Sequence, residues 1–289
     1  MRKFSNFACV DWSGEAVAKP KGLAVAHVET GSSAPVLLRP QGGWSREGVL
    51  EWLKRLASSK TDIVVGLDLS PALPFVDCGS YFPGWHESPT SASELWDLVE
   101  NLSENNPHLS TRGFLSDATI RRHFRQFRDC GDLFPGGAGR LRVCEAGQKR
   151  MGLSPTSCFN LVGASQVGKS SLTGMRVLRR LRNEIPIWPF DPVPERGPLI
   201  VEIYTTIAAM AAGRSKSRAK IRDAAALDHA LVALQSQAHR GLPGYDDHST
   251  DAIVTAAWLR VSTSDERLWS PPDLTPQIAK TEGWTFGVV

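Results

Sequence analysis

The sequence predicts an α/β protein built on a mixed β-sheet that is flanked by helices. Three short β-rich runs open the chain, and an amphipathic segment then leads into a strongly apolar run, DIVVGLDLS. A second apolar run, PLIVEIYT, follows much later, at residues 198–205. This order predicts a three-stranded meander joined to parallel strands.

The first three runs cover residues 7–13 (FACVDWS), 22–29 (GLAVAHVE) and 34–40 (APVLLRP), with Gly, Pro, Ser and Lys between them. Ser45 is the expected N-cap of the helical segment that follows, GVLEWLKRLASS. The run DIVVGLDLS then has the character of a strand buried on both faces. We expect it to pair beside the first strand.

Residues 71–197 are rich in Pro, Gly and Ser, and we interpret them as a large insertion after the fourth strand, within a single domain of residues 1–289. The sequence predicts helices near 91–104 and 116–128 in this insertion. After the strand at 198–205, it predicts helices near 206–212 and 221–239 and another from 250 to about 261. The last residues, EGWTFGVV, are expected to form an edge strand.

Composition excludes several classes of protein. No apolar run approaches the roughly 20 residues that span a bilayer, and the N-terminus lacks the pattern of a secretory signal. The five cysteines are scattered and include no C-x-x-C pair, which argues against a disulfide framework and a zinc knuckle. We therefore expect a cytoplasmic protein with no membrane span.

Three aspartates occupy positions where this fold would bring them together. Asp11 ends the first strand, Asp68 ends the buried strand beside it, and Asp251 begins the helical run DAIVTAAWL. Converging carboxylate oxygens suit a hard divalent cation, so we predict a catalytic site that holds Mg²⁺ or Mn²⁺. The alternatives are local: Asp11 and Asp68 could start turns, and Asp251 could favour the helix dipole.

Three other polar residues are secondary candidates. Glu202 lies within the strand at 198–205, where it is either a further metal ligand or an outward-facing or salt-bridged residue. Asp247 lies one helical turn before Asp251 and could bind a metal or orient a ligand water. His248 could position a water.

Basic residues form three clusters, although the net charge is only +3. The clusters are Arg121, Arg122, Arg125 and Arg128; Arg176, Arg179, Arg180 and Arg182; and Arg214, Lys216, Arg218, Lys220 and Arg222. Such clusters could follow a phosphate backbone, which favours a nucleic-acid partner, or they could be a solvated surface. In the third cluster, we select Arg214, Lys216 and Lys220 as candidate substrate-phosphate ligands.

The segment from Gly163 to Ser170, GASQVGKS, matches the phosphate-binding loop pattern G-x-x-x-x-G-K-S/T. A nucleotide-binding phosphotransferase or ATPase is therefore an alternative function. Against it, no clean downstream strand ends in Asp, and Gly174 lies early in the following helix. Lys169 and Ser170 could contact a substrate phosphate in either enzyme.

These residues also carry a family resemblance. VDWSG, VVGLDLSPALP, SCFNLVGASQVGKSSLTGMRVLRRLR, PLIVEIYT and DDHSTDAIVTAAWLR together resemble the predicted RNase H-like nuclease family known as domain of unknown function 429. The ending resembles the RuvC-like branch of that superfamily. The resemblance implies an RNase H-like sheet on which Asp11, Asp68 and Asp251 hold two metal ions. Asp68 departs from the Glu that is frequent at its position.

The expected activity is hydrolysis of phosphodiester bonds in nucleic acid by a metal-activated water. Two further alternatives stay open. RNase H-like kinases use the first-strand Asp for magnesium and nucleotide phosphate, but they usually need two copies of the fold. A catalytically inactive nucleic-acid-binding module would keep its basic patch without needing the acids.

Overall fold

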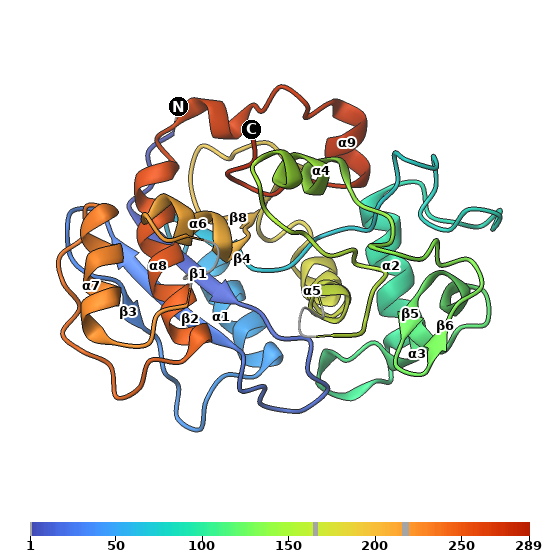
Figure 1. Ribbon diagram of the computed structural model, residues 1–289, viewed down its shortest axis with the longest axis horizontal. Coiled ribbons are helices and arrows are strands. Elements are labelled where there is room, and N and C mark those ends of the chain that lie inside the picture. The colour runs from blue at the N-terminus through green and yellow to red at the C-terminus, as the bar shows by residue number, and fades with distance from the viewer. Residues whose placement is uncertain (1, 164–166, 216–219) are drawn as a thin grey trace.

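The computed structural model describes residues 2–163, 167–215 and 220–289, and its centre is a six-stranded mixed sheet (Figure 1). The strand order is β3-β2-β1-β4-β8-β7. The strands are β1 (Asn6–Asp11), β2 (Ala24–Glu29), β3 (Val36–Leu37), β4 (Ile63–Leu67), β7 (Ile187–Trp188) and β8 (Leu199–Glu202). β1, β2 and β3 are antiparallel neighbours, whereas β1, β4, β8 and β7 run parallel. The predicted meander and parallel strands are confirmed.

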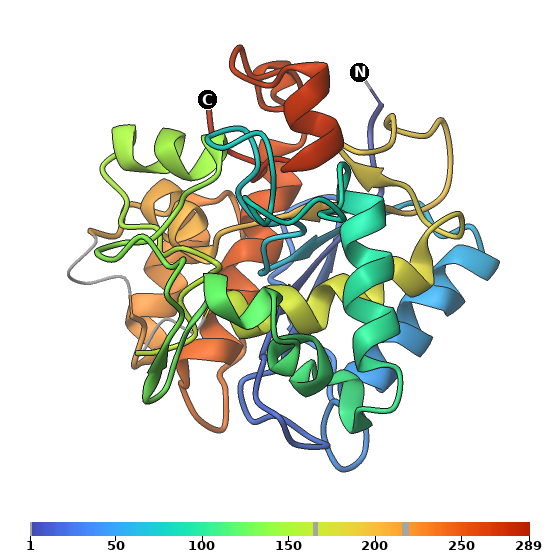
Figure 2. The same ribbon diagram turned by 90° about the vertical axis from the view of Figure 1, so that its right-hand side faces the viewer.

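Helices cover both faces of this sheet. They are α1 (Arg46–Ser58), α2 (Ala92–Ser103), α3 (Arg112–Ser116), α4 (Val143–Arg150), α5 (Val167–Leu181), α6 (Thr205–Ala211), α7 (Ala224–Ala233), α8 (Asp247–Ser262) and α9 (Pro276–Thr281). Two buried apolar clusters pack these helices against the sheet. One lies between the sheet and α1, α2 and α5, and the other lies between the sheet and α6, α7 and α8. Figure 2 shows α5 and α8 on opposite sides of the strands.

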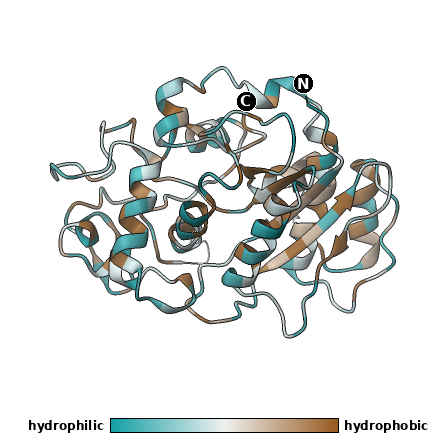
Figure 3. Cartoon of the chain, turned by 180° about the vertical axis from the view of Figure 1, so that it is seen from behind, coloured by the Kyte–Doolittle hydropathy of each residue, from teal (hydrophilic) through white to brown (hydrophobic). Residues whose placement is uncertain are grey.

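Apolar side chains concentrate in the strands. Figure 3 shows the strands mainly in brown, and the helices around them with mixed colours. Such a helix buries one face against the sheet and leaves the other in water. Within the described ranges, no helix is both long enough and apolar enough to cross a membrane.

The helices predicted after Ser45, near 91–104, near 206–212 and from 250 to about 261 are confirmed as α1, α2, α6 and α8, whereas the helix predicted near 116–128 is wrong. The side chain of Ser45 caps α1 by accepting the Gly48 amide, and α2 matches the helix predicted near 91–104. Residues 116–128 instead contain a short 3₁₀ turn at 120–123 and the strand β5 (Arg125–Gln126), which pairs with β6 (Asp129–Cys130). Asp117 explains the break, because its carboxylate accepts the amides of Thr119 and Ile120 and starts the tight turn.

The C-terminal part of the chain differs from expectation in two places. α7 is shorter than the helix predicted over 221–239. The prediction of a terminal edge strand is wrong. Among the described residues, the C-terminal segment pairs with the sheet only through a bridge between Glu202 and Thr285. Gly283 and Gly287 have positive φ, so the chain turns instead of extending, and Trp284 is buried.

The expected insertion at 71–197 does not lie wholly outside the sheet. Its last part supplies β7, which pairs with β8, and α5, which packs into the same core as α1. The segment that leaves the sheet is therefore shorter. In this segment, α2, α3 and the β5–β6 ribbon lie beyond α5, away from the meander (Figure 1).

Candidate functional site

The alternation of β1 decides where Asp11 points. Phe7 and Cys9 pack on the α8 side of the sheet, while Ala8 and Val10 pack on the α5 side. Asp11 continues the first series, so it faces α8, and only 6% of it is exposed.

Trp12 turns to the opposite face. Its indole Nε1 donates to Thr173 Oγ1 at 3.0 Å, so this tryptophan packs beneath the sheet against α5. Because the side chain is buried, it is a core residue and offers no stacking surface for a base.

Asp68 and Asp251 reach the same place from two other elements. Asp68 directly follows β4, and its backbone amide donates to Val10 O at 3.0 Å, which holds it beside the end of β1. Asp251 lies in the second turn of α8, whose N-cap, Asp246, accepts the Ser249 amide at 2.9 Å. Asp11, Asp68 and Asp251 all line one cleft of about 1200 Å³.

Burial raises the pKa of all three carboxylates, and the charge of Asp11 adds to the shift at Asp68 and at Asp251. Burial raises the pKa of Asp68 well above its usual value, and the charges of Asp11 and Asp251 add to the shift. Burial, followed by the charges of Asp11 and Asp247, raises the pKa of Asp251 to about 7. Burial also raises the pKa of Asp11, although its hydrogen bond with His248 opposes the shift. The cluster therefore concentrates negative charge in a partly dry place.

His248 is the nearest polar neighbour of Asp11. Its Nδ1 lies 3.2 Å from Asp11 Oδ2, and this contact raises the pKa of the imidazole. Gly22 allows the approach, because a Cβ there would lie 2.9 Å from His248 Cε1. The sequence places His248 beside Asp247 but gives no sign of its contact with Asp11, which is 237 residues away along the chain.

Glu202 lines the same cleft as the three aspartates, and its charge adds to the raised pKa of Asp68, but its carboxylate is directed to other partners. Its neighbour Val201 packs on the α8 side, so Glu202 faces the opposite side of the sheet. There Arg142 Nη2 lies 2.5 Å from Oε1 and Nη1 lies 2.9 Å from Oε2. Thr285 Oγ1 also donates to Oε1, at 2.7 Å. Both carboxylate oxygens are therefore already engaged.

Arg142 is fully buried and binds more than Glu202. Its guanidinium also donates to Glu145 Oε1 at 3.0 Å and to Ser70 Oγ at 3.0 Å. Glu282 supplies a backbone carbonyl to Arg142, while its own carboxylate accepts backbone amides from residues 75, 76 and 143. We call these residues (Arg142, Glu145, Glu202, Glu282) the arginine network. The sequence did not indicate it, because its members lie up to 140 residues apart.

Asp247 lines the cleft, but it is ion-paired with Lys220 and Arg222. The hydrogen bond from Arg222 is the main cause of its lowered pKa. A role as direct metal ligand would require it to give up these partners. Of the phosphate-binding candidates nearby, Lys220 lines the cleft, Arg214 Nη2 donates to Lys220 O at 3.1 Å, and Lys216 lies outside the described residues.

The first turn of α5 forms another wall of the cleft. A Cβ at Gly14 would lie 2.3 Å from the carbonyl carbon of Lys169 and 2.4 Å from the amide nitrogen of Ser170, so the turn after β1 touches this helix end. Both Lys169 and Ser170 line the cleft. Within the described ranges, Lys169 Nζ has no ion-pair partner.

The surroundings of this helix end do not match a nucleotide-binding loop. Residues 158–162 belong to no strand of the main sheet, whereas the loop pattern requires a strand before it. Residues 164–166 of the motif lie outside the described part of the chain. What the structure supplies is a helix start with a lysine beside three carboxylates.

The chemistry of the donor set fits a hard divalent cation. Asp11, Asp68 and Asp251 offer only oxygen, and neither Asp68 nor Asp251 has an ion-pair partner among the described residues. In the described part of the chain, no three His, Cys, Asp or Glu side chains already surround one ion position. The fit is thus one of charge and ligand type.

No family model, curated protein or solved structure matches this chain.

Proposed function

We propose that the protein is a metal-dependent nuclease that hydrolyses phosphodiester bonds in nucleic acid. The observation that carries this proposal is the convergence of Asp11, Asp68 and Asp251 in one cleft, where the described residues form no ion pair with Asp68 or Asp251. Such uncompensated, pKa-shifted carboxylates are typical of functional sites. The strand order and directions agree with the RNase H-like resemblance of the sequence and support the same proposal.

Each residue has a physical role in this proposal. Asp11, Asp68 and Asp251 would hold Mg²⁺ or Mn²⁺, which when bound supplies charge neutralisation at the phosphodiester and lowers the pKa of water. His248 hydrogen-bonds to Asp11 and limits the rotation of its carboxylate. Lys169 and Ser170, which line the same cleft, would bind the phosphate of the substrate.

The test is hydrolysis of a mixed panel of DNA and RNA with Mn²⁺ present, using Asp11→Asn as the loss-of-function variant. We expect hydrolysis to fall at least about a hundredfold, because the variant loses a carboxylate whose charge supports the transition state, while substrate binding is retained. Asp273→Asn is the matched control, because Asp273 pairs with Arg150 at the surface and does not line the cleft. Equal hydrolysis by the wild type and Asp11→Asn would contradict the proposal.

The same assay separates the inactive binding module from the nuclease. Such a module would bind nucleic acid equally well before and after Asp11→Asn, and neither protein would cleave it. A nucleotide-dependent phosphotransferase would instead consume ATP and transfer phosphate in the presence of Mg²⁺. The structure favours this alternative less, since the expected strand before the 163–170 motif is not found at residues 158–162.

A further inference from the structure

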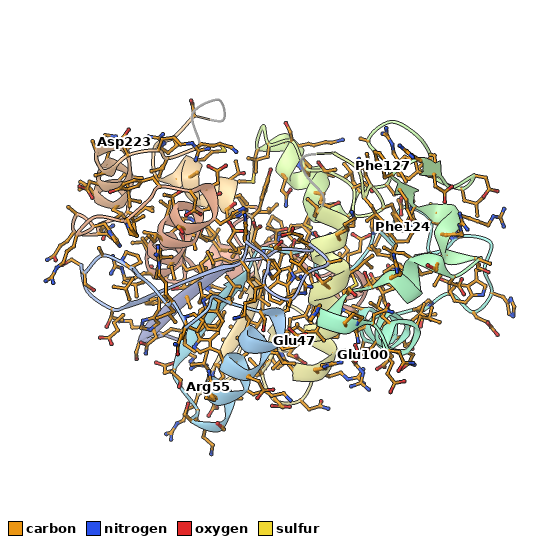
Figure 4. All side chains as sticks on the ribbon, turned by 90° about the horizontal axis from the view of Figure 1, so that it is seen from below. Glu47, Arg55, Glu100, Phe124, Phe127 and Asp223 are labelled. Atoms are coloured by element: carbon orange, nitrogen blue, oxygen red, sulfur yellow. The ribbon has the colours of Figure 1, made fainter. Side chains whose placement is uncertain are left out.

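Many of the basic residues that suggested a nucleic-acid partner are paired with acidic residues within the described part of the protein. The clearest case is α5, whose arginines face acidic residues of α2. Arg176 and Arg180 both bind the carboxylate of Glu100, at 2.6 Å each. Figure 4 labels Glu100 close to the α5 ribbon. Burial would raise the pKa of Glu100, but the hydrogen bonds from these two arginines lower it.

The remaining arginines of α5 are engaged in the same way. Arg179 and Arg182 both pair with Asp97, and Arg182 Nη1 lies 2.9 Å from its Oδ2. Arg176 also donates to the Ser110 carbonyl at 2.7 Å, and its side chain is 1% exposed. These guanidiniums bind α2 to α5. A phosphate backbone could reach them only by displacing internal partners.

The other two clusters are also partly paired. Arg121 binds Asp129 and Arg122 binds Asp132, both at 2.6 Å at the surface. Lys220 and Arg222, from the third cluster, share Asp247. The described residues therefore present no continuous row of unpaired cations leading to the carboxylates.

The cleft itself contains few cations that are free to bind phosphate. Of its described basic lining residues, Arg142 and Lys220 are paired, and only Lys169 and Arg112 have no ion-pair partner in the described ranges. Besides the charged residues Arg112, Arg142 and Glu145, the part of the wall that residues 71–163 contribute carries neutral polar side chains, among them Ser110, Thr111, Ser116, Gln126, Ser154 and Thr156. Hydroxyls and amides suit sugars and base edges, whereas long backbones require Lys and Arg.

The size of the cleft agrees with this lining. Its volume of about 1200 Å³ lies just above the roughly 300–1,000 Å³ of small-molecule pockets. Residues from β1, β8, α5, α8 and the 106–116 segment all border it, so it is walled on several sides. Specific duplex recognition usually buries roughly 1,000–2,500 Å² of protein surface, much of it positively charged.

We infer that the substrate is a short, single-stranded phosphodiester of a few nucleotides, held by one or two phosphate contacts in the cleft. This inference rests on the proposed nuclease function and narrows its substrate class. Lys169 supplies one contact at the helix start of α5, and the neutral wall binds the rest of the substrate. A long duplex has no comparable surface among the described residues.

The test compares hydrolysis of a tetranucleotide, a single strand of about 30 nucleotides and a duplex of the same length, with Mn²⁺ and the full-length wild-type protein. We expect kcat/KM for the tetranucleotide to lie within about tenfold of the long single strand and above the duplex. Raising the salt from about 50 to 200 mM should lower kcat/KM for the tetranucleotide less than about tenfold. Six to ten phosphate contacts would instead cost about 10³–10⁵-fold.

Two variants on the same helix sharpen the test. The salt slope is the slope of log(kcat/KM) against the logarithm of the salt concentration. Lys169→Gln should reduce its magnitude by about 1, as expected when a single phosphate ligand is lost. Arg179→Gln should leave the slope unchanged, because Arg179 is already paired with Asp97.

The outcomes are distinct. Preference for the duplex, or a steep salt slope, overturns the short-substrate inference and leaves the nuclease proposal standing. Binding of Mn²⁺ without hydrolysis of any of the three substrates overturns both.

Discussion

Two groups of buried charge lie at the same end of the sheet, on opposite faces, and they differ in how their charge is balanced. In the arginine network, the carboxylates of Glu145 and Glu202 both contact Arg142. On the α8 face, Asp68 and Asp251 have no such partner in the described part of the chain. Balanced buried charge is a structural solution, whereas an unbalanced buried carboxylate either takes up a proton or binds a cation. Both groups contain buried carboxylates, so the presence or absence of an ion-pair partner distinguishes the candidate site from the structural network, and the residue types alone do not.

Removing the balancing charge should have the largest effect on stability. We expect Arg142→Met to lower the free energy of unfolding by about 3–5 kcal/mol, because it leaves two carboxylates buried without their partner. Urea denaturation measures this loss. Arg150→Met is the matched control: its pair with Asp273 is exposed, so the loss should stay below about 1 kcal/mol. Equal losses in the two variants would show that the network is not structural.

A smaller loss should follow when the acidic partner of α5 is removed. Glu100→Gln weakens two ion pairs and leaves the buried guanidinium of Arg176 without its carboxylate. We expect a loss of about 2 kcal/mol, in the range of hydrogen bonds to charged groups. Thermal or urea unfolding checks it, with Asp132→Asn at an exposed pair as the control. A change under about 0.5 kcal/mol would mean that these arginines are free for an external partner.

Removing one of the unbalanced charges should instead raise the free energy of unfolding. The pKa of Asp251 is about 7 in the folded protein, above its ordinary value of 3.8. Between these values the folded state retains a proton that the unfolded state has lost, so the stability contribution falls as the pH rises through 7. Without metal, Asp251→Asn should therefore be more stable than the wild type at pH 8, by on the order of 1–2 kcal/mol.

The difference should shrink as the pH falls below 7 and disappear below pH 3.8, where the carboxylate is protonated in both states. Added Mn²⁺ should stabilise the wild type more than the variant, because only the wild type keeps all three acids. Denaturation at three pH values, with and without Mn²⁺, measures both effects. A variant that is less stable at pH 8 would indicate that Asp251 is a balanced structural residue.

The parts that the sequence predicts well depend on local patterns. β1 and β4 are short apolar runs, and each carries an aspartate at its end, so strand pairing alone brings Asp11 and Asp68 together. Ser45 and the amphipathic spacing after it suffice to place α1. Asp251 follows from the helical run that contains it.

The parts that the sequence does not predict depend on distant partners. Arg142 meets Glu202 across 60 residues, and Arg176 meets Glu100 across 76, so neither pairing leaves a local pattern. The face that Glu202 presents depends on its register beside β4, where it lies opposite Leu67. For the same reason, counting basic residues along the chain overstates the charge that is free to bind phosphate.

Determining where Mn²⁺ binds tests the central claim most directly. A crystal grown with Mn²⁺ and examined by anomalous scattering would locate the ion without any assumption about the substrate. The account predicts a peak bounded by Asp11, Asp68 and Asp251, with Glu202 still bound to Arg142. A metal-free cleft at saturating Mn²⁺, with the three carboxylates each held by protein groups, would contradict it.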